Sequence, residues 1–135
     1  MKTFTRLNIV LMFVFVFSFA DCKKKAGIDS IEWKDESLKL TAEICEKYRK
    51  CSEKNWSELP EKTRELAKSR LDEANCQKEF RQSNLYRLAG DDIPKTMDAY
   101  RNCHKEIIKS NCEDLQAGLV DINVDCKLVK KFQID

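Results

Sequence analysis

The stretch from Asp29 to Lys54, DSIEWKDESLKLTAEICEKYRKCSEK, decides the fold of this chain. It contains neither glycine nor proline and is rich in Glu, Lys and Leu, which all favour helix. Apolar side chains recur in it at intervals of four, four and three residues, namely at Leu40, Ile44, Tyr48 and Cys51. Because this spacing places them on one face of a helix, we predict a long amphipathic helix that packs through that face.

A second helix is predicted to follow a break at Asn55-Trp56-Ser57, since proline is tolerated in a first helical turn and Pro60 stands at its start. We expect this helix to run from about Pro60 to Ala74. The residues expected to face inward share a helical spacing and are Thr63, Leu66, Ala67, Leu71 and Ala74. Asn75 is predicted to cap a short further helix that contains Cys76 and Phe80.

The C-terminal half shows a third long helical pattern. Gly90 is a stop signal, and Asp91-Asp92 followed by Pro94 is a start signal. The residues predicted to share the inner face of this helix are Met97, Tyr100, Cys103 and Ile107.

The residues after this helix predict shorter elements. Asn111 is predicted to cap a short helix that Gly118 ends. The alternation of Val120, Ile122 and Val124 predicts an extended link. A final helical turn is then expected to contain Cys126, Val129 and Phe132.

Seven cysteines occur in the 135 residues. Six of them lie in the predicted helical region, and an even number in an exported chain predicts three disulfides. These six are Cys45, Cys51, Cys76, Cys103, Cys112 and Cys126. The predicted fold class is therefore all-α: a small helical bundle stapled by disulfides that follows an N-terminal signal peptide.

Geometry limits how these cysteines pair. Six residues of helix rise about 9 Å, so Cys45 and Cys51 are too far apart for a disulfide on one helix. If the first two helices form an antiparallel hairpin, Cys76 lies closer to the level of Cys45, and we predict that these two pair. Cys51 is then left to reach Cys103, Cys112 or Cys126, and the sequence does not choose among them.

The N-terminus has the three parts of a secretory signal peptide, which we assign to residues 1–21. Lys2 and Arg6 precede an unbroken apolar run from Ile9 to Phe17, and the small-x-small sequence Ser18-Phe19-Ala20 follows it. This run is well short of the ~20 apolar residues that span a bilayer. The chain is therefore predicted to be exported.

The seventh cysteine, Cys22, stands at the end of this segment. Phe19-Ala20-Asp21-Cys22 resembles a bacterial lipobox of the looser kind found in spirochaetes, although Asp21 replaces the usual small residue. We predict lipidation of Cys22, because lipidation removes the odd thiol from an otherwise even set. Residues 22–28 then form a charged tether and residues 29–135 a single cysteine-rich helical domain. The alternative is cleavage after Ala20, which releases a soluble chain that begins at Asp21.

The C-terminal third of the chain resembles a known group. The spacing Cys103-x8-Cys112-x2-Leu115-x2-Gly118-x7-Cys126 is similar to that of small cysteine-rich helical lipoproteins and exported proteins of spirochaetes and related bacteria. The resemblance covers about residues 45–130. It implies a helical, exported protein and transfers no catalytic residue.

Motifs for catalysis or cofactor binding are not found in the sequence. It has no C-x-x-C pair, phosphate-binding loop, nucleophile elbow or H-E-x-x-H motif. His104 is the only histidine, and neighbouring residues on a helix point about 100° apart, so His104 and Cys103 do not converge on a metal ion. We predict a surface histidine, and no catalytic, cofactor-binding or metal residues.

The acidic residues are also predicted to be structural. Glu43 with Lys47 and Glu46 with Lys50 have the i,i+4 spacing of solvated pairs on a helix. The pairs Asp91-Asp92 and Glu113-Asp114 are expected to be helix-start acids and not a calcium site. Trp33 and Trp56 are both expected to be partly buried lids over the core.

Charge argues against one class of partner and for another. With 25 Lys and Arg against 23 Asp and Glu, the net charge of +2 provides no basic field for nucleic acid. The run Lys23-Lys24-Lys25, by contrast, is expected to attract anionic lipid head groups next to the predicted anchor; the alternative is a soluble spacer.

Two functions are compatible with these features. The first is a non-enzymatic lipoprotein of the cell envelope or surface, anchored to the membrane through Cys22 and acting on an unknown protein partner. The second is a soluble secreted carrier that encloses a small apolar ligand. Insect odorant-binding proteins are the obvious comparison for the second, but they have a C-x3-C step that this chain lacks.

Overall fold

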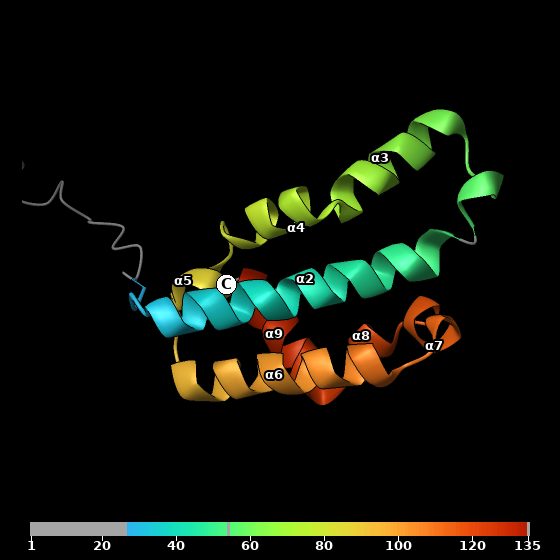
Figure 1. The fold of residues 1–135 in the computed structure, drawn as a ribbon. Helices are drawn as coiled ribbons and strands as arrows, with labels where there is room; N and C mark the ends of the chain where they lie inside the picture. The colour runs from blue at the N-terminus through green and yellow to red at the C-terminus, as the bar shows by residue number, and fades with distance from the viewer. Residues whose placement is uncertain (1–26, 54, 135) are drawn as a thin grey trace, which may run out of the picture.

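The computed structural model describes residues 27–53 and 55–134, so the predicted signal peptide and Cys22 lie outside the described part. These described residues form helices and no strand, which confirms the predicted all-α class (Figure 1). The elements are α2 (Ile31–Glu53), the 3-10 helix η1 (Trp56–Glu58), α3 (Glu61–Leu71), α4 (Glu73–Phe80), α5 (Asn84–Arg87), α6 (Ile93–Lys109), α7 (Cys112–Gln116), α8 (Leu119–Ile122) and α9 (Val124–Ile134). Within these residues, no helix has the length and apolar character that a bilayer crossing needs.

The bundle consists of two helical hairpins that lie side by side. In the first hairpin the chain runs out along α2 and returns through α3 and α4; in the second it runs out along α6 and returns through α9 (Figure 1). The short helix α5 lies at the end of the bundle where α2 and α6 both begin. The turn between η1 and α3, and helix α7, lie at the other end.

The two outgoing helices, α2 and α6, run parallel, and three contacts from Glu43 onward share one separation. Glu43 contacts His104, Lys47 contacts the carbonyl of Ile108, and Cys51 is bonded to Cys112, and each of these pairs is separated by 61 residues. Because residue numbers increase on both sides from one contact to the next, the two helices point in the same direction. The return segment α3–α5 is what makes this parallel arrangement possible.

The inner face of α2 differs from the predicted one. Its buried residues follow four-residue steps at Trp33, Ser37, Thr41 and Cys45, and Cys51 is buried further along, as predicted. The other residues of the predicted stripe, Leu40, Ile44 and Tyr48, are half-buried at the margin of the core. Ser37 and Thr41 fit inside because their side chains are small and hydrogen-bonded. The prediction counted only apolar residues and therefore placed the inner face of α2 part of a turn away from the observed one.

The prediction for the second helix was wrong in its packing. Helix α3 has no buried residue, and Thr63, Leu66 and Ala74 are exposed, whereas Ala67 and Leu71 are half-buried. The reason is position: α3 lies on the side of α2 opposite to α6, beyond the end of α4, where α2 alone lies beneath it (Figure 1).

Helix α6 agrees with the prediction. Tyr100, Cys103 and Ile107 are buried, and Met97 packs against the core from a half-buried position. Asp92 stands immediately before the helix and proline occupies its first turn. This helix supplies the second hairpin with its continuous apolar face.

Side chains cap the N-termini of several helices, and one of the two predicted asparagine caps is correct. The side chain of Asn111 accepts a hydrogen bond from the amide of Asp114 at 2.7 Å, which confirms the predicted cap of α7. For α4 the cap is Asp72, which accepts from the amide of Asn75 at 3.4 Å, so the predicted cap at Asn75 was wrong. Asn75 instead lies in the first turn.

The predicted extended link near residue 122 was also wrong. Helices α8 and α9 occupy this stretch, and Asn123 separates them by accepting a hydrogen bond from the amide of Cys126 at 3.0 Å. Ile122 and Val124 flank the break and are 72% and 79% exposed. Their alternation therefore reflects two exposed positions on either side of a cap, and not the two faces of a strand.

Candidate functional site

All six cysteines of the described part are paired. Cys45 bonds to Cys76 as predicted, with Cα atoms 6.5 Å apart. Cys51 bonds to Cys112, which is one of its three predicted alternatives, with Cα atoms 5.2 Å apart. The remaining disulfide joins Cys103 to Cys126, at a Cα distance of 4.8 Å.

The disulfides follow the architecture of the two hairpins. Cys45–Cys76 closes the first hairpin by joining α2 to α4, and Cys103–Cys126 closes the second by joining α6 to α9. Cys51–Cys112 joins the hairpins to each other where α2 ends and α7 begins. Because such bonds form and persist in oxidising surroundings, the folded chain belongs to an oxidising, extracytoplasmic compartment.

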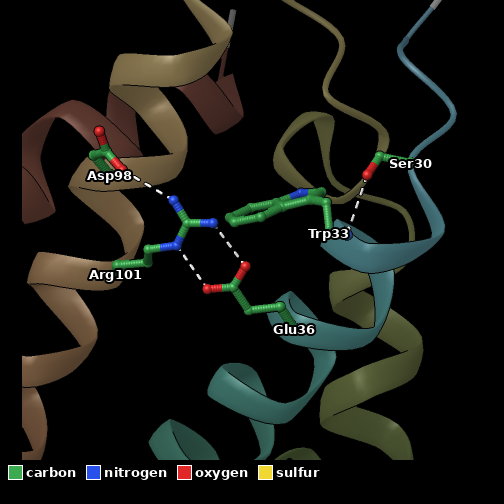
Figure 2. Close-up of polar contacts among 5 residues, drawn as sticks. All are labelled: Ser30, Trp33, Glu36, Asp98 and Arg101. Carbon is green, nitrogen blue, oxygen red and sulfur yellow. Dashed lines mark hydrogen bonds and ion pairs between the residues drawn. The ribbon is translucent and has the colours of Figure 1, made fainter.

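An ion-pair cluster joins the start of α2 to α6, and Figure 2 shows its geometry. The Nε and Nη2 atoms of Arg101 donate to the two carboxylate oxygens of Glu36 at 2.6 and 2.7 Å. The Nη1 atom donates to Asp98, one turn earlier on α6, at 2.9 Å. This planar, two-pronged pairing fixes the guanidinium more firmly than a single contact does.

The pairing stabilises the charged forms of both Glu36 and Arg101. Hydrogen bonding from Arg101 holds the pKa of Glu36 below its ordinary value of 4.5. The same bonds raise the pKa of Arg101, which stays charged. A carboxylate with a lowered pKa is a poor proton acceptor near neutrality, so this cluster serves to join helices and is not suited to general acid–base chemistry.

Trp33 lies beneath this cluster and is not the lid that the sequence predicted. It is 1% exposed, and its Nε1 donates to the carbonyl of Leu85 at 2.9 Å. The guanidinium carbon of Arg101 lies 5.6 Å from its ring centroid, so the cation covers the outer side of the ring. The missed signal was the four-residue step from Trp33 through Ser37 and Thr41.

A buried hydroxyl pair forms the next contact between α2 and α6. The Thr41 hydroxyl donates to the carbonyl of Ser37 at 2.7 Å. Its oxygen lies 2.6 Å from the Tyr100 hydroxyl, which donates to it because Thr41 has only one proton to give. Burial raises the pKa of Tyr100 to about 12, so this phenol stays neutral.

His104 was predicted to be a surface residue, and this prediction was wrong. Its side chain is 12% exposed, and Nε2 lies 2.7 Å from Oε2 of Glu43. The parallel register of α2 and α6 brings Glu43 here, away from the predicted partner Lys47, which donates weakly to the carbonyl of Ile108. Across the described residues, His, Cys, Asp and Glu form no group of three or more arranged to hold a metal ion.

The other predicted polar residues have structural positions. Glu46 and Lys50 form the predicted i,i+4 pair at 2.7 Å. Glu113 and Asp114 lie in the first turn of α7, as expected for helix-start acids. Trp56 is half-buried in η1, as predicted, and the ammonium of Lys68 lies 5.5 Å from its ring centroid.

The chain enters the fold at a fixed point. A Cβ atom built on Gly27 would overlap the carbonyl group of Arg87 at the end of α5, so the backbone of Gly27 is in close contact with this helix. Ile28 and Ile31, which follow it, are 55% and 70% exposed. We call the surface formed by Gly27, Ile28, Ile31 and Arg87 the N-terminal end face.

In comparisons with family models, with curated proteins and with solved structures, no significant match to the chain was found. Inference about function therefore depends on the residues themselves. They present two kinds of feature: polar contacts that join α2 to α6, and the N-terminal end face through which the tether would leave.

Proposed function

We propose that this chain is a non-enzymatic exported lipoprotein, anchored to the membrane through Cys22, which displays a rigid helical bundle in the cell envelope or at the cell surface to bind a protein partner. One observation carries the proposal. The folded body uses six of the seven cysteines in disulfides, and the seventh is the one that stands at the end of the predicted signal peptide.

The state of the polar residues supports a binding role over catalysis. Arg101 with Glu36, Tyr100 with Thr41, and His104 with Glu43 are each engaged across the contact between α2 and α6. Groups held in this way fix two helices relative to each other. A protein that acts by presenting a surface requires this rigidity, whereas a catalyst requires groups that are available to a substrate.

The alternative, a soluble carrier of a small apolar ligand, would have to open the core. Aromatic rings meet there: the centroid of Tyr100 lies 6.0 Å from that of Trp33 and 5.6 Å from that of Phe80. Such ring contacts fill the space between α2, α4 and α6. For this reason we prefer the anchored binding module.

The intact mass of the mature protein tests the proposal. The full chain is produced in a bacterial host with a lipoprotein pathway, and membrane and soluble fractions are analysed separately. We expect a chain that begins at Cys22 and carries acyl groups, found in the membrane fraction. A Cys22→Ala variant should move to the soluble fraction.

Two results would overturn the anchor. One is an unmodified mature chain that begins at Asp21, which would favour the soluble carrier. The other is a Cys22→Ala variant that still fractionates with membranes as the wild type does. The carrier alternative is tested by titrating the folded protein with an apolar fluorescent probe, because stoichiometric binding would support a carrier.

A further inference from the structure

Two exposed isoleucines mark the place where the chain enters the bundle. Ile28 is 55% exposed and Ile31, the first residue of α2, is 70% exposed. They lie within four residues of Gly27, whose backbone is pressed against the carbonyl of Arg87. The pair is therefore held at a defined end of the bundle, at which α2, α5 and α6 meet (Figure 1).

The chain outside the described part places these isoleucines near the membrane. Five residue steps separate Cys22 from Gly27, which span at most about 17 Å even when fully extended. An acyl chain on Cys22 would hold the N-terminal end face within this distance of the bilayer surface. Helix α2 has 23 residues, so the turn after it would lie about 35 Å farther away along the helix axis.

The local charges suit the same surface. Lys23, Lys24 and Lys25 precede the end face, and lysines next to a membrane are attracted to anionic head groups. The two acids that flank Ile31 in the sequence each have a partner: Asp29 pairs with Lys34, and Glu32 accepts from the hydroxyl of Ser30 at 3.2 Å. Apolar side chains next to a basic segment are the usual composition of an interfacial membrane contact.

We propose that Ile28 and Ile31 insert shallowly into the bilayer and form a second membrane contact, which docks the N-terminal end face on the lipid and points η1 and α7 away from it. The occupant of this face is a lipid surface with anionic head groups. The inference rests on the proposed anchoring, because only the anchor brings the end face to the membrane.

The test uses residues 22–135 with the three disulfides formed, so that Cys22 is the reactive thiol. A single acyl chain of myristoyl length is coupled to Cys22 through a maleimide, since one such chain gives only marginal, reversible binding. Partition into vesicles of phosphatidylethanolamine and phosphatidylglycerol is measured by sedimentation. The contribution of the isoleucines then appears as a change in a measurable equilibrium.

We expect Ile28→Ser combined with Ile31→Ser to lower the partition coefficient by about tenfold, as partial burial of two isoleucines implies. The matched control is Ile122→Ser combined with Val124→Ser, which removes apolar side chains that are even more exposed, at the break between α8 and α9. This control should leave partition unchanged. Circular dichroism and a thiol count check that each variant is folded.

Unchanged partition of the Ile28/Ile31 variant would overturn the inference, and so would an equal loss in the control. Loss of a concentration-dependent dimer without any loss of vesicle binding would assign the face to a second copy of the chain and would also overturn it. Because the acyl chain is attached chemically, vesicle partition tests the isoleucines even if cells do not lipidate Cys22. Failure of cells to lipidate Cys22 would refute only the proposed anchor.

Discussion

Arg101 shows how one side chain connects sequence, fold and stability. It reaches from α6 to Glu36 on α2, pairs with Asp98 on its own helix, and covers the ring of Trp33. Arg101 and Glu36 are each about a third exposed, at 35% and 38%, so solvent screens their attraction. Their main effect is to fix the angle between two helices.

The Glu36 carboxylate makes stability dependent on acid pH. Its pKa is lowered in the folded chain by hydrogen bonds from Arg101, so its stabilising contribution is full above its unfolded value of about 4.5 and is lost as pH falls through the lower folded value. We expect Glu36→Gln to cost about 1 kcal/mol or less near neutral pH. It should also weaken the loss of stability in acid.

Urea denaturation at neutral pH and at acid pH measures this difference. The control is Glu106→Gln on the exposed side of α6. If the Glu36 and Glu106 variants lose stability in acid to the same extent as the wild type, the account of the Arg101 pair is wrong.

Tyr100 makes stability dependent on alkaline pH. Burial raises its pKa to about 12, so the unfolded chain ionises this phenol near 10 while the folded chain does not. Stability contributed by the neutral phenol is present below about pH 10 and is lost as pH rises toward 12. Tyr100→Phe should remove this dependence and cost about 1 kcal/mol for the bond to Thr41.

Absorbance titration of the three tyrosines tests this behaviour. In the wild type the last step should be that of Tyr100, at about 12, and this step should be missing in Tyr100→Phe, whereas burial also raises the pKa of Tyr48 and this shift should remain. Titration of all three together near pH 10 in the folded chain would contradict the burial of Tyr100.

For single residues, the sequence predicted a local ion pair correctly but did not predict which side chains are buried. The Glu46–Lys50 pair needs only helical spacing, and it is present. Trp33 and His104 were placed wrongly because their surroundings come from another helix: Tyr100 and Arg101 cover one, and Glu43 covers the other. A local period contains no information on which helix lies opposite.

Among the elements, α3 is the one with the least support. It has no buried residue and lies over α2 alone at the outer edge of the first hairpin. Its covalent support comes through α4, where Cys76 is bonded to Cys45. Local opening should therefore begin at α3.

Hydrogen exchange measures this order of opening. In the wild type, amides of α3 should exchange faster than those of α6. Replacing Cys45 and Cys76 with Ala should accelerate exchange in α3 and α4 and leave α6 and α9 close to wild type, because Cys103–Cys126 still closes the second hairpin. Equal acceleration in both hairpins would show that they do not open independently.

Helix positions were more predictable than helix packing. The absence of glycine and proline between Asp29 and Lys54 was sufficient for α2, and Asn111 was sufficient for the start of α7. The inward face assigned to α3 failed, since periodic apolar residues do not show whether a second layer covers them. Val120 to Val124 failed because the cap at Asn123 imitates strand alternation.

For the whole molecule, the disulfide between the hairpins has the longest loop. Cys51 and Cys112 are 61 residues apart, and a loop of this size corresponds to about 4 kcal/mol of restricted unfolded-chain entropy. Replacing both with Ala should lower the free energy of unfolding by about that amount. The Cys22→Ala variant of residues 22–135 is the control, and its stability should equal that of the parent.

Chemical denaturation of the oxidised proteins provides the measurement. A Cys22→Ala variant as unstable as the Cys51/Cys112 variant would indicate that Cys22 takes part in a disulfide, and would contradict the division of seven cysteines into one and six. An alkylation count of more than one free thiol in folded residues 22–135 would contradict it as well.

The class of the fold and one disulfide were accessible from the sequence, but the partner of Cys51 was not. Cys45–Cys76 follows from a local hairpin, whereas Cys51–Cys112 depends on the 61-residue register between α2 and α6. The same two helices also meet at the buried hydroxyl pair of Thr41 and Tyr100. The register is a property of the assembled bundle.

The overlapping disulfides also determine how the bundle responds to a mechanical pull. Tension between Gly27 and the C-terminus travels along α2 to Cys51, crosses to Cys112, and returns through Cys103 to Cys126. Helices α3, α4 and α5 lie outside this shortest covalent path and bear no tension. Tension applied between Gly27 and the C-terminus therefore bypasses α3 and α4, which stay free of the force.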